Sequence, residues 1–149
     1  MRSARRPSAC LWRYRIEPRL RYSRPRGISR SSLRGWAALG NDAIDGSAGT
    51  DTVSYEFSQD AVTANLTTGT ATGEGTDTLT GIENLNGSRS TDNLTGDAGP
   101  NILHGLAGGD TVSGSDGDDT LIGDEGTDTL DGGNGTDTCD GESEVNCEA

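Results

Sequence analysis

The chain is poor in the residues that build an ordinary protein core. Of its 149 residues only 30% are hydrophobic and 4% are aromatic, and it contains one Phe, one Met and no Lys. A conventional globular core is not expected from this material. Low hydrophobicity with high net charge is typical of disordered chains, so an ordered fold needs a stabilising agent beyond apolar burial, and a counter-ion is the natural candidate.

Long apolar runs and catalytic motifs are also missing. No stretch approaches the roughly 18 apolar residues of a membrane span, and the N-terminal segment lacks the apolar region of a secretory signal peptide. The sequence has a single His, His104, and no G-x-S-x-G motif. A Ser–His–Asp site is therefore not supported, and we expect no enzymatic activity within these residues.

Charge is divided unevenly along the chain. Residues 1–40 hold eleven of the twelve Arg and one acid, a net charge of +10, whereas residues 41–149 hold one Arg and 23 acids, a net charge of −22. Residues 1–36 are rich in Arg, Pro and Ser without any repeat, and we expect a disordered leader there. Such a leader could attract nucleic acid, but the acidic part would repel phosphate, so we expect no nucleic-acid partner.

A nine-residue pattern, G-x-x-G-x-D-x-U-x with U a medium-sized apolar residue, dominates the acidic part. Six units run without a break over residues 87–140, and each begins with Gly. The fourth place is Gly in five units, with Ser90 as the exception. The sixth place holds Asp92, Asn101, Asp110, Asp119, Asp128 and Asp137. The eighth place holds Leu94, Leu103, Val112, Leu121, Leu130 and Cys139.

The same phase appears upstream and defines the expected organisation of the chain. Its sixth places there are Asp42, Asp51 and Asp77. The pattern is interrupted at about residues 55–71, where AVTANL alternates as a strand does and TTG is typical of a turn. We therefore expect a leader over 1–36, repeats over 37–140 and a C-terminal cap over 141–149.

Each unit can be interpreted as a turn followed by a short strand. We expect Gly at the first and fourth places to supply the positive φ of a tight turn, and the sixth-place Asp to add a carboxylate. Places seven to nine form a strand whose eighth side chain points inward. Because one apolar residue in nine cannot form a core alone, stacked coils must align these residues in ladders.

Stacking such turns creates a charge problem that a cation would relieve. At a strand spacing of about 4.8 Å, carboxylates of successive coils come close together, and two unit charges about 5 Å apart repel by roughly 3 kcal/mol at an effective dielectric constant of about 20. Carboxylate and carbonyl oxygens with flexible geometry suit Ca²⁺, whereas Mg²⁺ requires a strict octahedron. Zn²⁺ and Cu²⁺ favour His or Cys, which do not recur in the turns.

These units resemble the hemolysin-type calcium-binding repeat, the RTX nonapeptide. The resemblance implies an all-β fold, a right-handed parallel β-roll with two nonapeptides per coil and several Ca²⁺ ions between turns on the same edge. Asp92 would then face Asp110, and Asp110 would face Asp128. On the other edge, Asn101 would face Asp119, and Asp119 would face Asp137. Carbonyls near these glycines would complete the shells: Gly105, Gly108, Gly114, Gly117, Gly123, Gly126, Gly132 and Gly135. Weaker candidate ligands are Asp42, Asp51, Asp77 and Asp118.

The chain departs from this pattern in residues 87–104. Asn101 has no charge, Pro100 stiffens its turn, and Ser90 replaces a turn Gly. We therefore expect weaker sites at 87–104 than at 105–137.

The expected function is calcium binding coupled to folding. Without Ca²⁺ the acidic segment would be expanded and largely disordered, and with Ca²⁺ it would wind into the roll. This behaviour suits a secreted or cell-surface structural module, and calcium is the one partner that the sequence indicates. Two alternatives stay open: the C-terminal repeat part of a larger secreted enzyme or toxin, and a Ca²⁺-dependent adhesin or surface element.

Two of the three cysteines lie close together at the acidic end. Cys139 and Cys147 are eight residues apart, and a disulfide between them would fasten the last coil and cap the open edge of the solenoid. We expect this bridge, which would favour an oxidising, extracytoplasmic location. Two unpaired thiols are the alternative.

Overall fold

The computed structural model describes residues 34–36, 40–73 and 75–148 of the chain. Within these ranges every assigned element of regular secondary structure is a β-strand. These residues contain no helix that is long and apolar enough to cross a membrane. The leader that the sequence predicts over residues 1–36 lies outside the described residues up to residue 33, and only its last three residues are described. Those three, Arg34–Trp36, form strand β1 and pair with β3, so the first coil starts earlier than the repeat pattern indicates.

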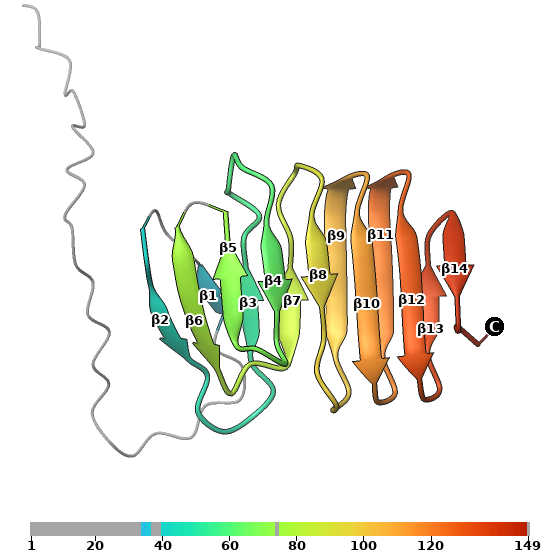
Figure 1. Cartoon of the computed structure of the whole chain (residues 1–149), viewed down its shortest axis with the longest axis horizontal. Helices are drawn as coiled ribbons and strands as arrows, with labels where there is room; N and C mark the ends of the chain where they lie inside the picture. Colours follow the sequence, from blue (N-terminus) through green and yellow to red (C-terminus); the bar gives the residue numbers. More distant parts are fainter. Residues whose placement is uncertain (1–33, 37–39, 74, 149) are drawn as a thin grey trace, which may run out of the picture.

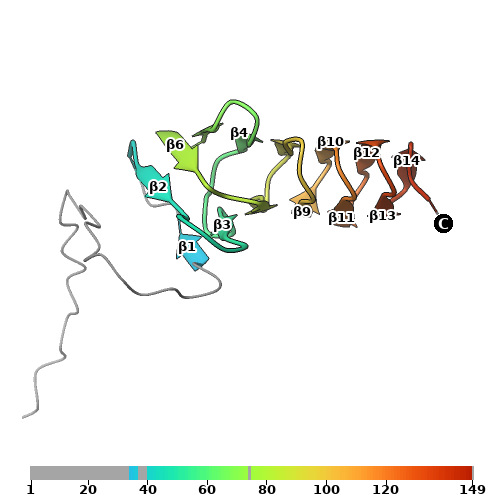
Figure 2. The same ribbon diagram turned by 90° about the horizontal axis from the view of Figure 1, so that it is seen from below.

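The described strands form two sheets, and Figures 1 and 2 show them following one another along the long axis in two layers. Sheet A is parallel throughout and has the order β1 (Arg34–Trp36), β3 (Thr52–Ser54), β7 (Asn84–Asn86), β9 (Ile102–Gly108), β11 (Thr120–Gly126), β13 (Thr138–Asp140). Sheet B has the order β14 (Ser143–Val145), β12 (Thr129–Asn134), β10 (Thr111–Asp116), β8 (Asn93–Thr95), β4 (Thr63–Asn65), β5 (Thr70–Thr72), β6 (Thr76–Thr80), β2 (Ala43–Asp45).

The register of the parallel strands sets the size of one coil. Thr111 of β10 pairs with Thr129 of β12, and Thr120 of β11 pairs with Thr138 of β13. Both pairs are two nonapeptides apart, because successive repeats alternate between the two sheets. The expected parallel β-roll, with two repeats in each coil, is confirmed.

The core is a double row of apolar side chains between the sheets. The eighth-place residues Leu94, Leu103, Val112, Leu121 and Leu130 are at most 1% exposed. Those of β8, β10 and β12 belong to sheet B, and those of β9 and β11 belong to sheet A. Each strand therefore contributes one side chain to the core, as the alternation along a strand requires.

The interruption at 55–71 is built from antiparallel strands. Strand β4 lies in the segment AVTANL and β5 follows after a turn at residues 66–69. Strand β5 pairs antiparallel with both β4 and β6, whereas β4 continues the parallel stack by pairing with β8. The insertion therefore widens sheet B without breaking the roll.

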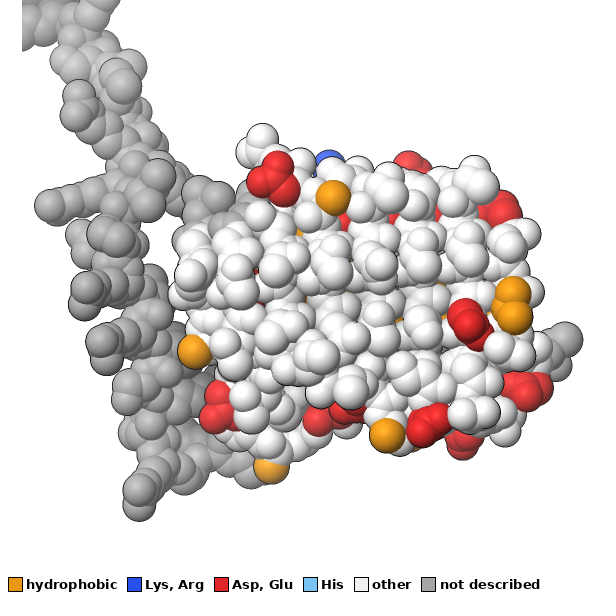
Figure 3. Space-filling view, viewed as in Figure 1, with side chains coloured by type: hydrophobic (Ala, Val, Ile, Leu, Met, Phe, Trp, Pro, Cys, Tyr) orange, Lys and Arg blue, Asp and Glu red, His pale blue; other side chains and the backbone are white. Residues whose placement is uncertain are grey.

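The outer faces of the sheets are mostly polar, with Ile102 and Val145 as exposed hydrophobic exceptions. Along β10, for example, Thr111 and Ser113 point away from the core on either side of the buried Val112. Figure 3 shows one face of the molecule, on which uncharged atoms predominate and acidic side chains gather toward the margins. On this face most acidic side chains therefore lie toward the edges of the roll.

Candidate metal centre

The turns of residues 105–137 share one backbone conformation. Positive φ occurs at the second and fourth places of their repeats, not at the first and fourth as the sequence analysis expects. The fourth-place glycines Gly108, Gly117, Gly126 and Gly135 have φ between +120° and +155°. The second-place residues Leu106, Ser115, Asp124 and Gly133 have φ between +66° and +97°. Three of these second-place residues have a side chain, so part of the turn adopts a left-handed conformation that favours Gly.

The first-place glycines have a different role. A Cβ built on Gly105, Gly114 or Gly123 would lie 2.3–2.4 Å from Oδ2 of the Asp five residues later. The carboxylate folds back over the glycine, and any side chain would displace it. Lack of a side chain, and not a positive φ, is what the first place requires.

The sixth-place carboxylates form two ladders, one on each edge of the roll. On one edge the backbone N–H of Asp92 donates to Oδ1 of Asp110, and that of Asp110 donates to Oδ1 of Asp128, each at 2.8 Å. On the other edge the N–H of Asn101 donates to Asp119, and that of Asp119 donates to Asp137, again at 2.8 Å. The structure thus brings together the residues of successive coils that the sequence analysis paired.

Four of these carboxylates each keep one oxygen without a hydrogen-bond partner. Oδ2 of Asp110, Asp119, Asp128 and Asp137 is buried and accepts no hydrogen bond, and the residues themselves are at most 2% exposed. Leaving a buried charged acceptor unsatisfied costs several kcal/mol unless a cation or proton compensates. The four oxygens therefore fit a cation that lies between coils, because Oδ1 is already occupied.

Burial and like charge also change the acidity of these groups. Burial, with a smaller contribution from the charges of Asp92 and Asp128, raises the pKa of Asp110 to about 6. The pKa of Asp119 is raised by burial first and then by Asp137. Hydrogen bonds from the backbone oppose both shifts. The ladders are therefore sites at which positive charge is favoured.

The turn glycines place carbonyl oxygens at the same edges. A Cβ on Gly96 or Gly114 would meet the carbonyl oxygen of Gly114 or Gly132, at 2.4 Å and 2.5 Å. A Cβ on Gly126 or Gly135 would meet that of Gly108 or Gly117, at 1.4 Å and 1.7 Å. The carbonyls therefore lie against the neighbouring coil.

The described residues contain no group of three or more His, Cys, Asp or Glu side chains that could hold a metal ion by themselves.

The two sixth-place residues of 87–104 are satisfied by protein donors. Both oxygens of Asp92 accept hydrogen bonds from Ser88, one from its N–H and one from its hydroxyl, and Oδ1 also accepts from the N–H of Val62. The side-chain amide of Asn101 donates to the carbonyl of Glu83, and its oxygen accepts from the N–H of Asp97. These turns already have the hydrogen bonds that the downstream aspartates lack.

The weaker candidates differ among themselves. Asp77 accepts hydrogen bonds on both oxygens, from the N–H of Asp42 at 2.9 Å and from the hydroxyl of Tyr55 at 3.1 Å. Asp42 has a buried Oδ2 without a partner. Asp51 is buried, and its N–H donates to Glu83. Asp118 is exposed and accepts from the N–H of Thr136, outside the buried ladders.

Three glutamates that the repeat pattern does not indicate extend the ladders at their ends. Oε2 of Glu142 accepts the N–H of Asp128 at 3.0 Å, and Oε2 of Glu148 accepts that of Asp137. Glu83 does the same for Asp51 at 2.8 Å. Glu142 and Glu148 lie out of phase with the nonapeptide, whereas Glu83 stands nine residues before Asp92 and is therefore in phase with the array. In all three cases the longer Glu side chain reaches the position that Asp holds elsewhere.

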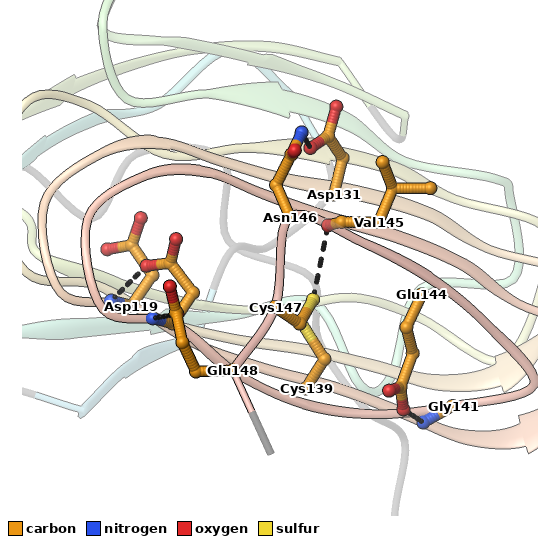
Figure 4. Close-up of a disulfide and its surroundings, with 10 residues drawn as sticks. Asp119, Asp131, Cys139, Gly141, Glu144, Val145, Asn146, Cys147 and Glu148 are labelled. Carbon is orange, nitrogen blue, oxygen red and sulfur yellow. Dashed lines mark hydrogen bonds between the residues drawn. A yellow bond between two sulfur atoms is a disulfide. The ribbon is translucent and has the colours of Figure 1, made fainter.

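The C-terminal cap is fastened by a disulfide, as the sequence analysis expects. Cys139 of β13 is bonded to Cys147, with 5.8 Å between their Cα atoms. Figure 4 shows the bridge beside Glu148, Asn146 and Asp131. Asn146 donates its side-chain amide to Asp131, so the segment after β14 is tied to the last full coil by a covalent bond and by hydrogen bonds.

Comparison with known proteins agrees with this geometry. The family model described as the RTX calcium-binding nonapeptide repeat matches four times, over residues 36–60, 78–112, 86–121 and 113–144. The curated proteins contain no match to the chain. The matched segments cover more than half of the 149 residues. The chain therefore belongs to the RTX calcium-binding nonapeptide repeat family.

Proposed function

We propose that the chain is a structural module that binds several Ca²⁺ ions between successive coils and gains its order from them outside the cell. Membership of the family already makes it a calcium-binding repeat module without a catalytic role of its own. The observation that carries the finer proposal is the row of buried Oδ2 atoms without partners on Asp110, Asp119, Asp128 and Asp137. A divalent cation would supply the positive charge that these oxygens lack.

The donor set agrees with calcium more than with other ions. The edges of the roll present carboxylates and glycine carbonyls, which are hard oxygen ligands with flexible geometry. On each edge an ion would bind to sixth-place carboxylates of neighbouring coils and to first- and fourth-place carbonyls. Each such ion would join two coils, so binding would be coupled to winding of the array.

Two considerations support the proposed location outside the cell. Calcium modules that work outside cells bind with dissociation constants of about 10⁻⁴ to 10⁻³ M, so they are loaded there and not at low intracellular calcium. The Cys139–Cys147 bridge forms and persists in oxidising compartments. At ten times its dissociation constant, each site would add about 1.4 kcal/mol to the free energy of unfolding.

The test is a calorimetric titration of the full chain with Ca²⁺, with Mg²⁺ as the control ion. We expect binding of several Ca²⁺ ions, weak or undetectable binding of Mg²⁺, and a gain in the β-sheet signal of far-UV circular dichroism with Ca²⁺ alone. A circular dichroism spectrum unchanged by millimolar Ca²⁺, or a titration without heat of binding, would contradict the proposal.

A further inference from the structure

The described coils divide into two groups by how their buried carboxylates are satisfied. We call residues 40–104 the upstream coils and residues 105–148 the downstream coils. Every sixth-place Asp of the downstream coils has a buried oxygen without a hydrogen-bond partner. In the upstream coils, Asp77, Asp92 and Asn101 are satisfied within the protein. Asp42 keeps a buried Oδ2 without a hydrogen-bond partner, and Asp51 is buried with its N–H bonded to Glu83.

At Asp77 a tyrosine hydroxyl satisfies the oxygen that corresponds to the unpartnered Oδ2 of the downstream aspartates. The Tyr55 hydroxyl donates to Oδ2 of Asp77, which is 5% exposed, while Oδ1 accepts the N–H of Asp42. Tyr55 lies in the interruption of the repeat pattern and is itself 5% exposed. The interruption therefore adds a donor as well as apolar surface to the upstream coils.

At Asp92 a serine has this role. The Ser88 side chain is fully buried, and its hydroxyl donates to Oδ1 of Asp92 at 2.8 Å. Ser88 occupies the second place of its repeat, and neither it nor Ser90 has the positive φ that the corresponding places have at 105–137. This turn therefore has a different backbone conformation, in which Ser88 satisfies both oxygens of Asp92.

At Asn101 the residue itself supplies the donors. Its side-chain NH₂ donates to the Glu83 carbonyl at 2.8 Å and to Oδ1 of Asp97 at 3.3 Å. An amide has no charge to neutralise, and it donates where a carboxylate would need an ion. Asn101 in place of Asp thus removes a charged calcium ligand, and it also removes the buried charge that an ion would have to neutralise.

The upstream coils also bury more apolar surface. Eight of the thirteen buried hydrophobic residues of the described core lie between residues 53 and 85: Val53, Tyr55, Val62, Ala64, Ala71, Leu79, Ile82 and Leu85. The downstream coils contribute only Val112, Leu121 and Leu130. The hydrophobic effect therefore favours folding of the upstream coils much more strongly.

We infer that the upstream coils fold without calcium and serve as the template on which the downstream coils wind when calcium binds. The inference rests on the proposed function and narrows it, because it confines the coupling of binding and folding to residues 105–148. Strand β8 and the first part of β9, residues 102–104, would present a preformed edge to β10 and β11, so the first downstream coil is added to existing sheets. Adding a strand to a formed edge avoids the cost of starting a solenoid.

The test is hydrogen exchange measured by mass spectrometry on the full chain, in chelator and in millimolar Ca²⁺. In chelator we expect amides of β4 to β8 to exchange at least about tenfold more slowly than those of β10 to β12. Calcium should slow exchange in β10 to β12 and change β4 to β8 little. Equal exchange of the two groups in chelator would overturn the inference.

The same samples separate failure of this inference from failure of the proposed function. If calcium binds and slows exchange equally in both groups, the proposed function stands and the template is wrong. If the titration shows no binding and exchange is the same in both conditions, the proposed function fails and the inference fails with it.

Variants test whether the protein donors stabilise the template. Ser88→Ala removes one donor to Asp92, and its control is Ser113→Ala on the outer face of β10. In chelator we expect Ser88→Ala to lower the protection of β4 to β8 about fivefold, as loss of one hydrogen bond predicts. Tyr55→Phe should lower it by about tenfold, because Asp77 keeps a buried oxygen without a donor. Protection equal to that of Ser113→Ala in both variants would contradict the assignment.

Discussion

Asp128 combines the two properties on which the proposed cation dependence of a downstream turn rests. Oδ1 accepts a hydrogen bond from the N–H of Asp110 in the preceding coil, and Oδ2 is buried without a partner. The residue as a whole is fully buried. In the absence of an ion its charge is repelled by Asp110, whereas under the proposed function it would be a ligand when an ion is bound. Removing that charge should therefore have opposite effects on the two states.

We expect Asp128→Asn to weaken calcium binding at the sites that it shares by about tenfold and to stabilise the ion-free chain slightly. The first effect follows from losing a charged ligand, and the second from losing like-charge repulsion. Calorimetric titration and thermal melts in chelator measure the two effects. Asp140→Asn, at an exposed position outside the ladders, is the control. Equal calcium affinity in both variants would contradict a ligand role for Asp128.

The first-place glycine can be tested by a matched pair. A Cβ on Gly123 would lie 2.4 Å from Oδ2 of Asp128, whereas a Cβ on Gly99 would have its nearest neighbour at 3.5 Å. Gly123→Ala should therefore lower the free energy of unfolding of the calcium-loaded protein by about 1–3 kcal/mol. Gly99→Ala should change it by less than about 0.5 kcal/mol. Chemical denaturation in saturating calcium measures both, and similar losses would exclude the contact as the cause.

The raised pKa of Asp110 predicts that acid partly replaces calcium. Its pKa is about 6 in the fold against 3.8 in the unfolded chain, because burial and neighbouring charge disfavour the carboxylate. The folded state thus binds the proton more tightly, and the stability from protonated Asp110 is complete below pH 3.8 and lost as the pH rises through about 6. In calcium-stripped buffer, circular dichroism should show more β-structure at pH 5 than at pH 7. No gain at pH 5 would contradict this.

At the scale of the turn and the strand, the sequence could predict the features that repeat every nine residues. The strand at places seven to nine, the inward residue at place eight and the facing Asp110 and Asp128 all repeat with the period, so the pattern contains them. The roles of Ser88, Tyr55, Glu142 and Glu148 arise once each. Their contacts depend on how the interruption and the cap fold, which no nine-residue pattern encodes.

The cap is the element whose covalent bond can be removed without altering a ladder residue. Strand β14 pairs with β12, and the cap is also held by the Cys139–Cys147 bridge and by hydrogen bonds of Glu142, Asn146 and Glu148. The double variant Cys139→Ser/Cys147→Ser should lower the free energy of unfolding of the downstream coils by about 2–3 kcal/mol, because the closed loop is short. Denaturation in calcium, with reductant added to the wild-type protein as a second route, measures the loss. Unchanged stability in both would show that hydrogen bonds alone hold the cap.

For the whole molecule, the distribution of charge predicts that calcium compacts the chain more than sodium chloride does at the same ionic strength. Residues 41–149 have a net charge of −22, and the buried part of it lies in two ladders that mobile ions cannot reach while the coils are closed. Sodium chloride screens the exposed acids over about 8–10 Å near physiological ionic strength but supplies no ligand-bound charge. Scattering in chelator should therefore show a larger radius of gyration than in about 10 mM CaCl₂. Sodium chloride at matched ionic strength should leave most of that expansion in place. Equal compaction by the two salts would mean that general screening, and not coordination between coils, closes the roll.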